Sequence, residues 1–166
     1  MAKTIRINGI SGVTLEDAVN ELRRYAEWVE RKETELIIRL AERGKVVASV
    51  KFAGAKYDGT NDVSVRVDST GSVAVIYAEG EAVAFIEFGS GAAEGYGHPQ
   101  AGELGFGPGT WSDSESGKGH WTDPDGWYYT HGKKSRGNPP AMAMYDAVQT
   151  MTAEITTIAR EVFGTA

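Results

Sequence analysis

The sequence contains no cysteine and no long apolar run, and both absences narrow the classes of protein to which it can belong. Without cysteine, neither a disulfide framework nor a thiolate metal site can form. No apolar run approaches the roughly 20 residues that a membrane-spanning helix needs, and the residues from Met1 to Arg6 lack the apolar core of a signal peptide. The sequence therefore predicts a protein made in a cytoplasm, with no membrane partner, whose fold is held together by packing.

Basic residues are also few, which argues against general binding of nucleic acid. The 166 residues include 17 Lys and Arg against 23 Asp and Glu, and the formal net charge is -6. An acidic chain gains nothing from neutralising phosphates. With 41% hydrophobic and 24% charged residues the composition is that of an ordinary globular protein, and the length suits a single domain over residues 1–166.

Hydrophobic periodicity predicts a helical region over residues 14–53. Thr14 is a suitable N-cap, and from Ala18 to Leu40 the apolar residues recur mostly three or four positions apart. Gly44 and the valines after it fit either the end of this helix and a strand, or a continued helix; we favour the continued helix because no turn cluster follows. Residues 1–13 fit an N-terminal arm or an edge strand.

After the turn signal at Asp58-Gly59 the hydrophobic period changes to two. Residues 62–88 predict a three-stranded antiparallel meander with turns near Gly71 and Gly80, and residues 127–131 predict a fourth strand. The expected fold is therefore α+β. It has an antiparallel four-stranded sheet packed by the long N-terminal helical region and by a C-terminal helix.

The C-terminal helix is predicted over residues 139–163. Asn138 is a suitable cap and Pro139 suits the first helical position. Six apolar residues then recur at spacings of four, three, four, three and four: Met144, Val148, Met151, Ile155, Ile158 and Val162. Such a stripe predicts a face buried in the core, and a seam with another chain is the alternative.

Residues 89–126 form a long glycine-rich loop that holds about half of the 21 glycines and shows no hydrophobic period. A loop of this length in a compact domain is usually functional or disordered. Aromatic residues in and after it favour burial against a partner, with burial on the chain's own sheet as the alternative. A short basic run follows, which fits either pairing with a neighbouring copy or a solvated run. The candidate subunit-interface residues are Trp111, Trp121, Trp127, Tyr128, Tyr129, Lys133, Lys134 and Arg136.

No motif in the sequence predicts catalysis, a metal or a cofactor. The strand that runs into Gly89-Ser90-Gly91 begins like a dinucleotide fingerprint, but the third glycine is missing and no helical pattern follows. No Gly-x-Ser-x-Gly elbow is present. The possible metal ligands lack the helical spacing of zinc enzymes; they are His98, Asp113, Glu115, His120, Asp123, Asp125 and His131. We therefore predict that the protein is not an enzyme.

Three segments, "IEFGSG" at 86–91, "GWYY" at 126–129 and "GNPPAMAMYDA" at 137–147, occur in an order and spacing that resemble a known family. The family is the tail-completion and head–tail joining (neck) proteins of long-tailed, lambda-like bacteriophages and prophages, and the resemblance covers most of the chain. This sequence departs from the family pattern at Ala141-Met142-Ala143, where a bulky residue often follows the proline. The resemblance implies an α+β fold, assembly into a ring that is commonly a hexamer, and no catalytic residues.

The function implied by this resemblance is that of a virion structural protein, a tail-completion, tail-terminator or head–tail connector subunit. Its partners would be copies of itself and the neighbouring neck and tail proteins, and the genome would pass through the ring without specific binding. The protein would be found in the virion, and in the host cytoplasm during assembly. Two alternatives remain: a small binding module or enzyme that uses residues 89–126 as a lid, and a minor capsid-associated protein.

Overall fold

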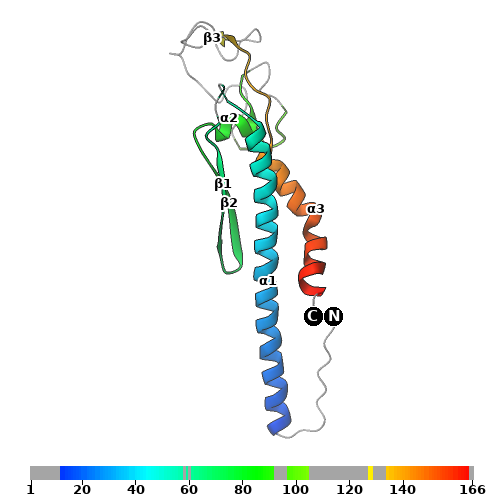
Figure 1. Cartoon of the computed structure of the whole chain (residues 1–166). Helices are drawn as coiled ribbons and strands as arrows, with labels where there is room; N and C mark the ends of the chain where they lie inside the picture. The colour runs from blue at the N-terminus through cyan, green and yellow to red at the C-terminus, as the bar shows by residue number, and fades with distance from the viewer. Residues whose placement is uncertain are drawn as a thin grey trace.

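A computed structural model describes residues 12–57, 59, 61–91, 97–104, 127–128 and 134–164. The long helix α1 lies at the centre, with a two-stranded hairpin on one side and the C-terminal helix on the other (Figure 1). The elements in chain order are α1 (Gly12–Gly54), β1 (Ser64–Thr70), β2 (Val73–Glu79), α2 (Val83–Phe88), β3 (Trp127–Tyr128), β4 (Lys134–Ser135) and α3 (Ala143–Gly164).

Helix α1 is a single element of 43 residues that covers the region 14–53 predicted as helical and includes residues 12–13, which we assigned to an arm. Gly44 lies inside this helix. At its C-terminal end, the side-chain amide of Asn61 donates hydrogen bonds to the carbonyl oxygens of Phe52 at 2.5 Å and Ala55 at 2.9 Å. The carbonyl of Phe52 also accepts a hydrogen bond from the backbone N–H of Ala55 at 3.0 Å, so Asn61 adds a second donor from outside the helix.

Strands β1 and β2 form an antiparallel hairpin that packs one face against α1. The register places Val65 opposite Ala78 and Val67 opposite Ile76, and these four side chains are half-buried. Successive side chains of a strand point to opposite faces of the sheet. The exposed residues between them, Tyr77 among them, therefore face away from α1.

The predicted four-stranded sheet is wrong. The described residues form two separate two-stranded sheets, β1–β2 and β3–β4, and Ala82–Phe88, predicted as the third strand of the meander over 62–88, contains helix α2. Short apolar runs fit a buried helix as well as a strand. Here the carboxylate of Asp62 accepts hydrogen bonds from the backbone N–H of Glu81 at 2.6 Å and of Ala82 at 3.1 Å, which stabilises the start of a helix. The chain nevertheless combines helices with antiparallel strands, which agrees with the α+β class.

The fourth strand, predicted over 127–131, was expected to belong to the same sheet as the meander, and this expectation is also wrong. Only Trp127–Tyr128 are in a described strand, and they pair with Lys134–Ser135 instead of the β1–β2 hairpin. Of the predicted loop over 89–126, the structure describes 89–91 and 97–104. The remainder of that loop and residues 1–11 of the predicted arm lie outside the described residues.

Helix α3 begins at Ala143, four residues later than predicted. Asn138, predicted as its cap, forms an antiparallel bridge with Ser90, and the two backbone hydrogen bonds of this bridge measure 2.9 and 3.0 Å. Gly137, next to the bridge, has a φ of 98°, and a Cβ at this position would overlap the carbonyl oxygen of Ser90. The bridge therefore requires glycine beside it.

The core lies where α1, α2 and α3 meet. Its buried members are mostly small, which lets the helices approach closely: Ala48, Phe52, Ala82, Ile86, Ala143 and Ala147. Along α3, Val162 is fully buried, but Val148 is 51% exposed and Ile155 is 46% exposed. The predicted burial of the whole α3 stripe is therefore wrong for these two residues, which lie at the edge of the contact between α3 and α1.

Candidate functional site

The N-terminus of α3 is capped by a buried carboxylate from α2. Glu87 is 4% exposed. One of its oxygens, Oε2, accepts a hydrogen bond from the backbone N–H of Met144 at 2.9 Å, and Oε1 accepts one from Tyr145 at 3.0 Å. These N–H groups have no partner within the helix, and a negative charge is favourable at this end of the helix dipole. A residue 57 positions earlier in the chain therefore supplies the cap.

His98 completes this junction. Its Nε2 lies 3.3 Å from Oε1 of Glu87, and its Nδ1 accepts a hydrogen bond from the backbone N–H of Gln100 at 3.1 Å. The ring contacts Phe88, with centroids 4.5 Å apart, and Tyr145, with centroids 5.6 Å apart. Because Nδ1 accepts, a neutral ring carries its proton on Nε2 and donates to Glu87. Nε2 thus links the segment 97–104 to Glu87 of α2, Nδ1 makes a hydrogen bond within that segment, and the ring contact with Tyr145 reaches α3.

The metal site and the dinucleotide site considered in the sequence analysis do not form among the described residues. There, no three or more His, Asp or Glu side chains gather as metal ligands. The remaining candidate ligands, His120 and His131 among them, lie outside the described residues, as do Asp113, Glu115, Asp123 and Asp125. The sequence Gly89-Ser90-Gly91 enters the bridge to Asn138 and is not followed by a helix in the described segments.

The predicted interface residues are only partly described. Trp127 and Tyr128 form β3, and the register places Tyr128 opposite Lys134 of β4. Arg136 is exposed. The other four, Trp111, Trp121, Tyr129 and Lys133, lie outside the described residues.

An exposed apolar surface on the N-terminal part of α1 was not predicted. Trp28 of α1 packs edge-on against Phe163 near the C-terminal end of α3, with ring centroids 5.9 Å apart. The segment of α1 before this contact, residues 15–27, is called here the α1 tail, and in Figure 1 α1 extends beyond both α3 and the hairpin. Its four large apolar side chains are exposed by 59% for Leu15, 38% for Val19, 54% for Leu22 and 39% for Tyr25, whereas Ala18 is buried. The sequence holds one signal of this surface. The apolar stripe of α1 is much longer than the stripe predicted for the C-terminal helix, so part of it has no helix of that length to pack against.

The hairpin has a second exposed apolar surface, on the face that points away from α1. This outer hairpin face carries Val73, Val75 and Tyr77, which are 60%, 42% and 37% exposed. The guanidinium of Arg66 lies 4.1 Å from the centroid of the Tyr77 ring and 2.9 Å from a carboxylate oxygen of Glu79, which raises the pKa of Arg66. Antiparallel sheets that face water on one side usually carry polar residues there. This outer face is mixed, because β1 contributes the polar Ser64, Arg66 and Asp68 to it beside the apolar residues of β2.

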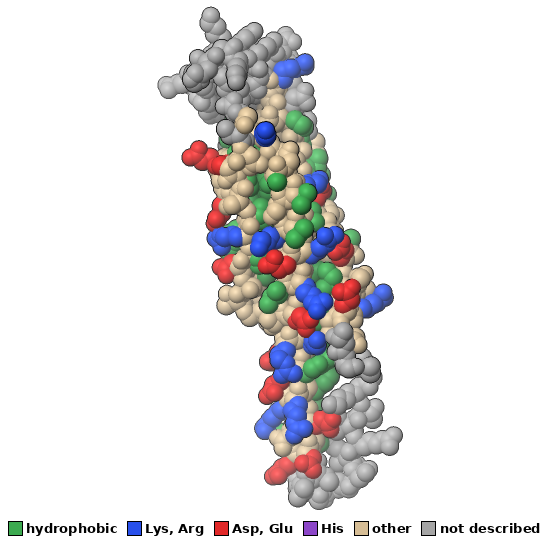
Figure 2. All heavy atoms as spheres, in the orientation of Figure 1, with side chains coloured by type: hydrophobic (Ala, Val, Ile, Leu, Met, Phe, Trp, Pro, Cys, Tyr) green, Lys and Arg blue, Asp and Glu red, His purple; other side chains and the backbone are tan. Residues whose placement is uncertain are grey.

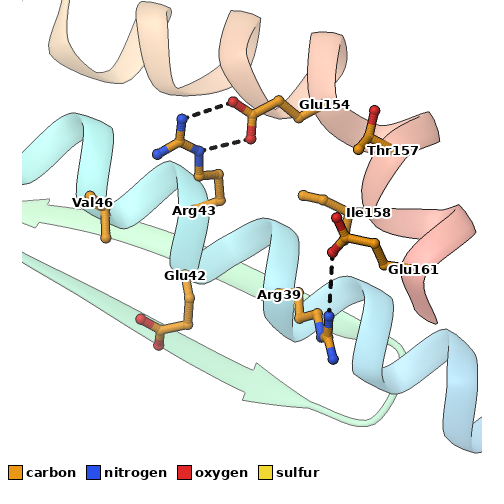
Figure 3. A pocket seen from close by; sticks show the side chains of 8 residues that line it. All are labelled: Arg39, Glu42, Arg43, Val46, Glu154, Thr157, Ile158 and Glu161. Carbon is orange, nitrogen blue, oxygen red and sulfur yellow. Dashed lines mark hydrogen bonds and ion pairs between the residues drawn. The ribbon is translucent and has the colours of Figure 1, made fainter. Parts of the chain in front are cut away.

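A groove of about 490 Å³ lies between α1 and α3 (Figure 3). Arg43 of α1 makes a bidentate ion pair with Glu154 of α3, with both hydrogen bonds at 2.8 Å, and Arg39 lies 3.6 Å from Glu161. The hydrogen bonds with Arg43 lower the pKa of Glu154, and the same contact raises the pKa of Arg43. These charges satisfy one another across the groove, so they hold α3 to α1 and leave little charge to recruit a ligand.

Acidic and basic side chains are interspersed along α1 on the face that Figure 2 shows, with no large patch of one sign. Such a mixture lacks the basic stripe expected of a nucleic-acid-binding surface. Among the described helices, none is both long and apolar enough to cross a membrane.

Comparisons with protein-family models, with curated proteins and with solved structures found no match to this chain. The interpretation of its function therefore rests on the sequence resemblance and on the surfaces described above. The exposed surfaces, rather than the buried Glu87–His98 pair, are the features that can meet another molecule.

Proposed function

We propose that this chain is a structural subunit of a tailed-bacteriophage virion. It acts by assembly, as a tail-completion or head–tail joining protein at the neck or upper end of the tail. The observation that carries the proposal is the exposure of large apolar side chains on regular elements, namely the α1 tail and the outer hairpin face. Apolar surface of this kind, bordered by charged residues, marks contact with other proteins.

The junction at the N-terminus of α3 supports the same proposal. Two of the segments that carry the phage resemblance, 86–91 and 137–147, meet there through the Ser90–Asn138 bridge and the Glu87 cap. Their order and spacing in the sequence thus correspond to one structural unit. This unit fixes both ends of the intervening glycine-rich segment on the folded body.

The resemblance adds the partners and the symmetry to the proposal. Copies of the chain close into a ring, which is commonly a hexamer in that family, between the neighbouring neck and tail proteins. The genome passes through this ring without specific binding. The chain has 23 acidic and 17 basic residues, and this acidic excess disfavours contacts with DNA phosphates. No chemical step is required of the protein.

Two measurements test this proposal together. Sedimentation of the purified chain should show oligomers that grow with protein concentration, and electron microscopy should show closed rings. Particles made without the protein should be filled heads and separate or aberrant tails. A chain that stays monomeric at every concentration and in the particle, together with normally joined virions in its absence, would refute the proposal. A monomer stabilised by a small ligand would favour the alternative of a lidded binding module instead.

A further inference from the structure

The segment 97–104 lies on the folded body with one buried side chain. Of its eight residues, His98 is buried, Ala101 is half-buried and the other six are exposed. Leu104, the largest apolar side chain of the segment, is 55% exposed. Burial therefore anchors this segment at one point, which is the ring of His98.

The polar contacts of the segment also converge on His98. The hydrogen bond between Nε2 of His98 and Oε1 of Glu87, at 3.3 Å, is the sole one that joins the segment to the rest of the described chain. Inside the segment, the backbone N–H of Gln100 donates to Nδ1 of His98 at 3.1 Å, and that of Ala101 donates to the His98 carbonyl oxygen at 3.2 Å. The N–H of Leu104 donates to the carbonyl oxygen of Gln100 at 3.0 Å. A helical turn of this length is not stable alone in water, so these internal bonds depend on the anchor.

The cap of α3 does not depend on His98. Oε1 of Glu87 accepts from His98 and also from the backbone N–H of Tyr145, while Oε2 accepts from the N–H of Met144. When the imidazole is withdrawn, each carboxylate oxygen keeps one backbone donor. A buried charge is costly when it loses its partners, and this carboxylate does not lose them. Withdrawal of His98 therefore breaks one hydrogen bond to the body and the ring contacts with Phe88 and Tyr145.

We propose that residues 97–104 form a releasable strap, which docks on the body through His98 and opens as a unit while α3 stays folded and capped. Proteins open locally in cooperative units, and units with few buried apolar contacts open most readily. The inference does not depend on ring assembly, because every contact that it uses lies within one chain.

Opening of the strap changes the surface at the start of α3. The docked ring of His98 covers part of the Glu87 carboxylate and of the rings of Phe88 and Tyr145. Release uncovers a carboxylate between two aromatic rings and leaves the helices around it in place. The strap thus gives one folded body two different surfaces at this junction.

Amide hydrogen exchange, resolved by residue, tests the strap in the unchanged chain. The N–H groups of Ala101 and Leu104, called here the strap amides, report its opening, and those of Met144 and Tyr145, the cap amides, report α3. After correction for intrinsic rates, we expect the strap amides to be protected, yet to exchange at least about tenfold faster than the cap amides. Equal protection of both sets, or no protection of the strap amides, would overturn the proposal.

Substitutions of His98 identify the anchor. His98→Ala should speed exchange of the strap amides at least about tenfold, the effect of losing a hydrogen bond to a charged group. The cap amides should change by less than about threefold. His98→Gln keeps an N–H donor for Glu87 and should fall between His98→Ala and the unchanged chain. Leu104→Ala is the matched control in the same segment, and because Leu104 is exposed it should change neither set.

Two results with His98→Ala would refute the strap. Loss of protection at the cap amides would show that His98 belongs to the folding unit of α3. Unchanged protection of the strap amides would show that other contacts hold the segment. Neither result bears on the proposed function, which the assembly measurements test separately.

Discussion

Substitution of Gly44 tests the packing of the three central elements most directly. This residue lies in the C-terminal half of α1, where the hairpin and α3 both reach the helix. A Cβ built there would be 2.6 Å from the Cδ1 atom of Ile76 and 2.6 Å from the Sδ atom of Met151. Carbon atoms in contact are normally about 3.5–4.0 Å apart. Both neighbours must therefore move to admit even one methyl group.

Two opposing effects set the change in the free energy of unfolding when Gly44 is replaced. Replacing glycine by alanine inside a helix stabilises it by about 1 kcal/mol, whereas overpacking a well-filled core costs about 1–3 kcal/mol. Because the two obstructing atoms belong to side chains that can turn, we expect Gly44→Ala to lower the free energy of unfolding by about 1 kcal/mol. Gly44→Val places two further methyl groups in the same gap and should lower it by about 3 kcal/mol.

Thermal and urea unfolding measure these changes, and a loss of 1 kcal/mol lowers the melting temperature of a domain this size by about 2–4 °C. Gly54→Ala is the matched control, because Gly54 is also in α1 but has nothing within 4 Å of its Cβ position. That variant should be neutral or slightly more stable. If Gly44→Ala stabilises the protein as much as Gly54→Ala does, or if Gly44→Val leaves it unchanged, the three elements do not meet at Gly44.

Three further predictions concern the Glu87 cap of α3, the stability of the protein at low pH and the core around Val162. Glu87→Gln removes the charge that caps α3 and should cost about 2 kcal/mol in urea unfolding, while the exposed Glu81→Gln should change little; equal effects would count against the cap. Two backbone N–H groups hold the pKa of Asp62 below its ordinary value of 3.8. Its stabilising contribution is therefore present above that value and is lost as the pH falls through the lower pKa of the folded protein. Asp62→Asn should accordingly flatten the loss of stability between about pH 5 and pH 2, and an unchanged acid profile would exclude this role. Val162→Asp should unfold the chain because Val162 is fully buried, whereas Ile155→Asp, 46% exposed, should keep its helical circular dichroism; the reverse order would contradict the packing of α3.

Elements that are specified by neighbouring residues were predictable from the sequence. The recurrence of apolar residues from Ala18 to Leu40 is a local signal, and it suffices to indicate α1. The turn at Gly71, between two segments of alternating residues, likewise indicates the β1–β2 hairpin. In both cases the residues that decide the structure lie within a few positions of one another, so a short stretch of sequence contains the necessary information.

Elements that are specified by distant residues were not predictable. Helix α2 begins where Asp62, 20 positions before Ala82, accepts its N–H, and α3 begins where Glu87 supplies the cap. The local start signal at Asn138 misled the prediction. Its backbone pairs with Ser90, and its side-chain amide donates to the carbonyl oxygen of Lys56 at 2.9 Å. Capping groups that come from elsewhere in the chain leave no mark near the helix that they start.

The candidate surfaces also divide into those that composition alone indicates and those that only the fold reveals. Aromatic and basic residues drew attention to the segment from Trp111 to Arg136 because composition is visible without a fold. The α1 tail required a comparison between elements, since α1 has 43 residues and α3, which packs along it, has 22. The outer hairpin face required the register, because both faces of β2 carry apolar residues and only the pairing with β1 tells which face meets α1.

The Ser90–Asn138 bridge has a consequence for variation among related chains. It joins two residues that are 48 positions apart and so brings both ends of the intervening segment to one point on the folded body. The entropy lost on closing a flexible segment grows only with the logarithm of its length, and doubling the length costs about 0.6 kcal/mol. The closure entropy of the bridge therefore sets only a weak limit on the number of residues between 91 and 137, provided that the glycine beside each end of the bridge and the contact of His98 with Glu87 are kept. Selection can then change the length and sequence of this segment to suit new neighbours while α1, the hairpin and α3 stay the same.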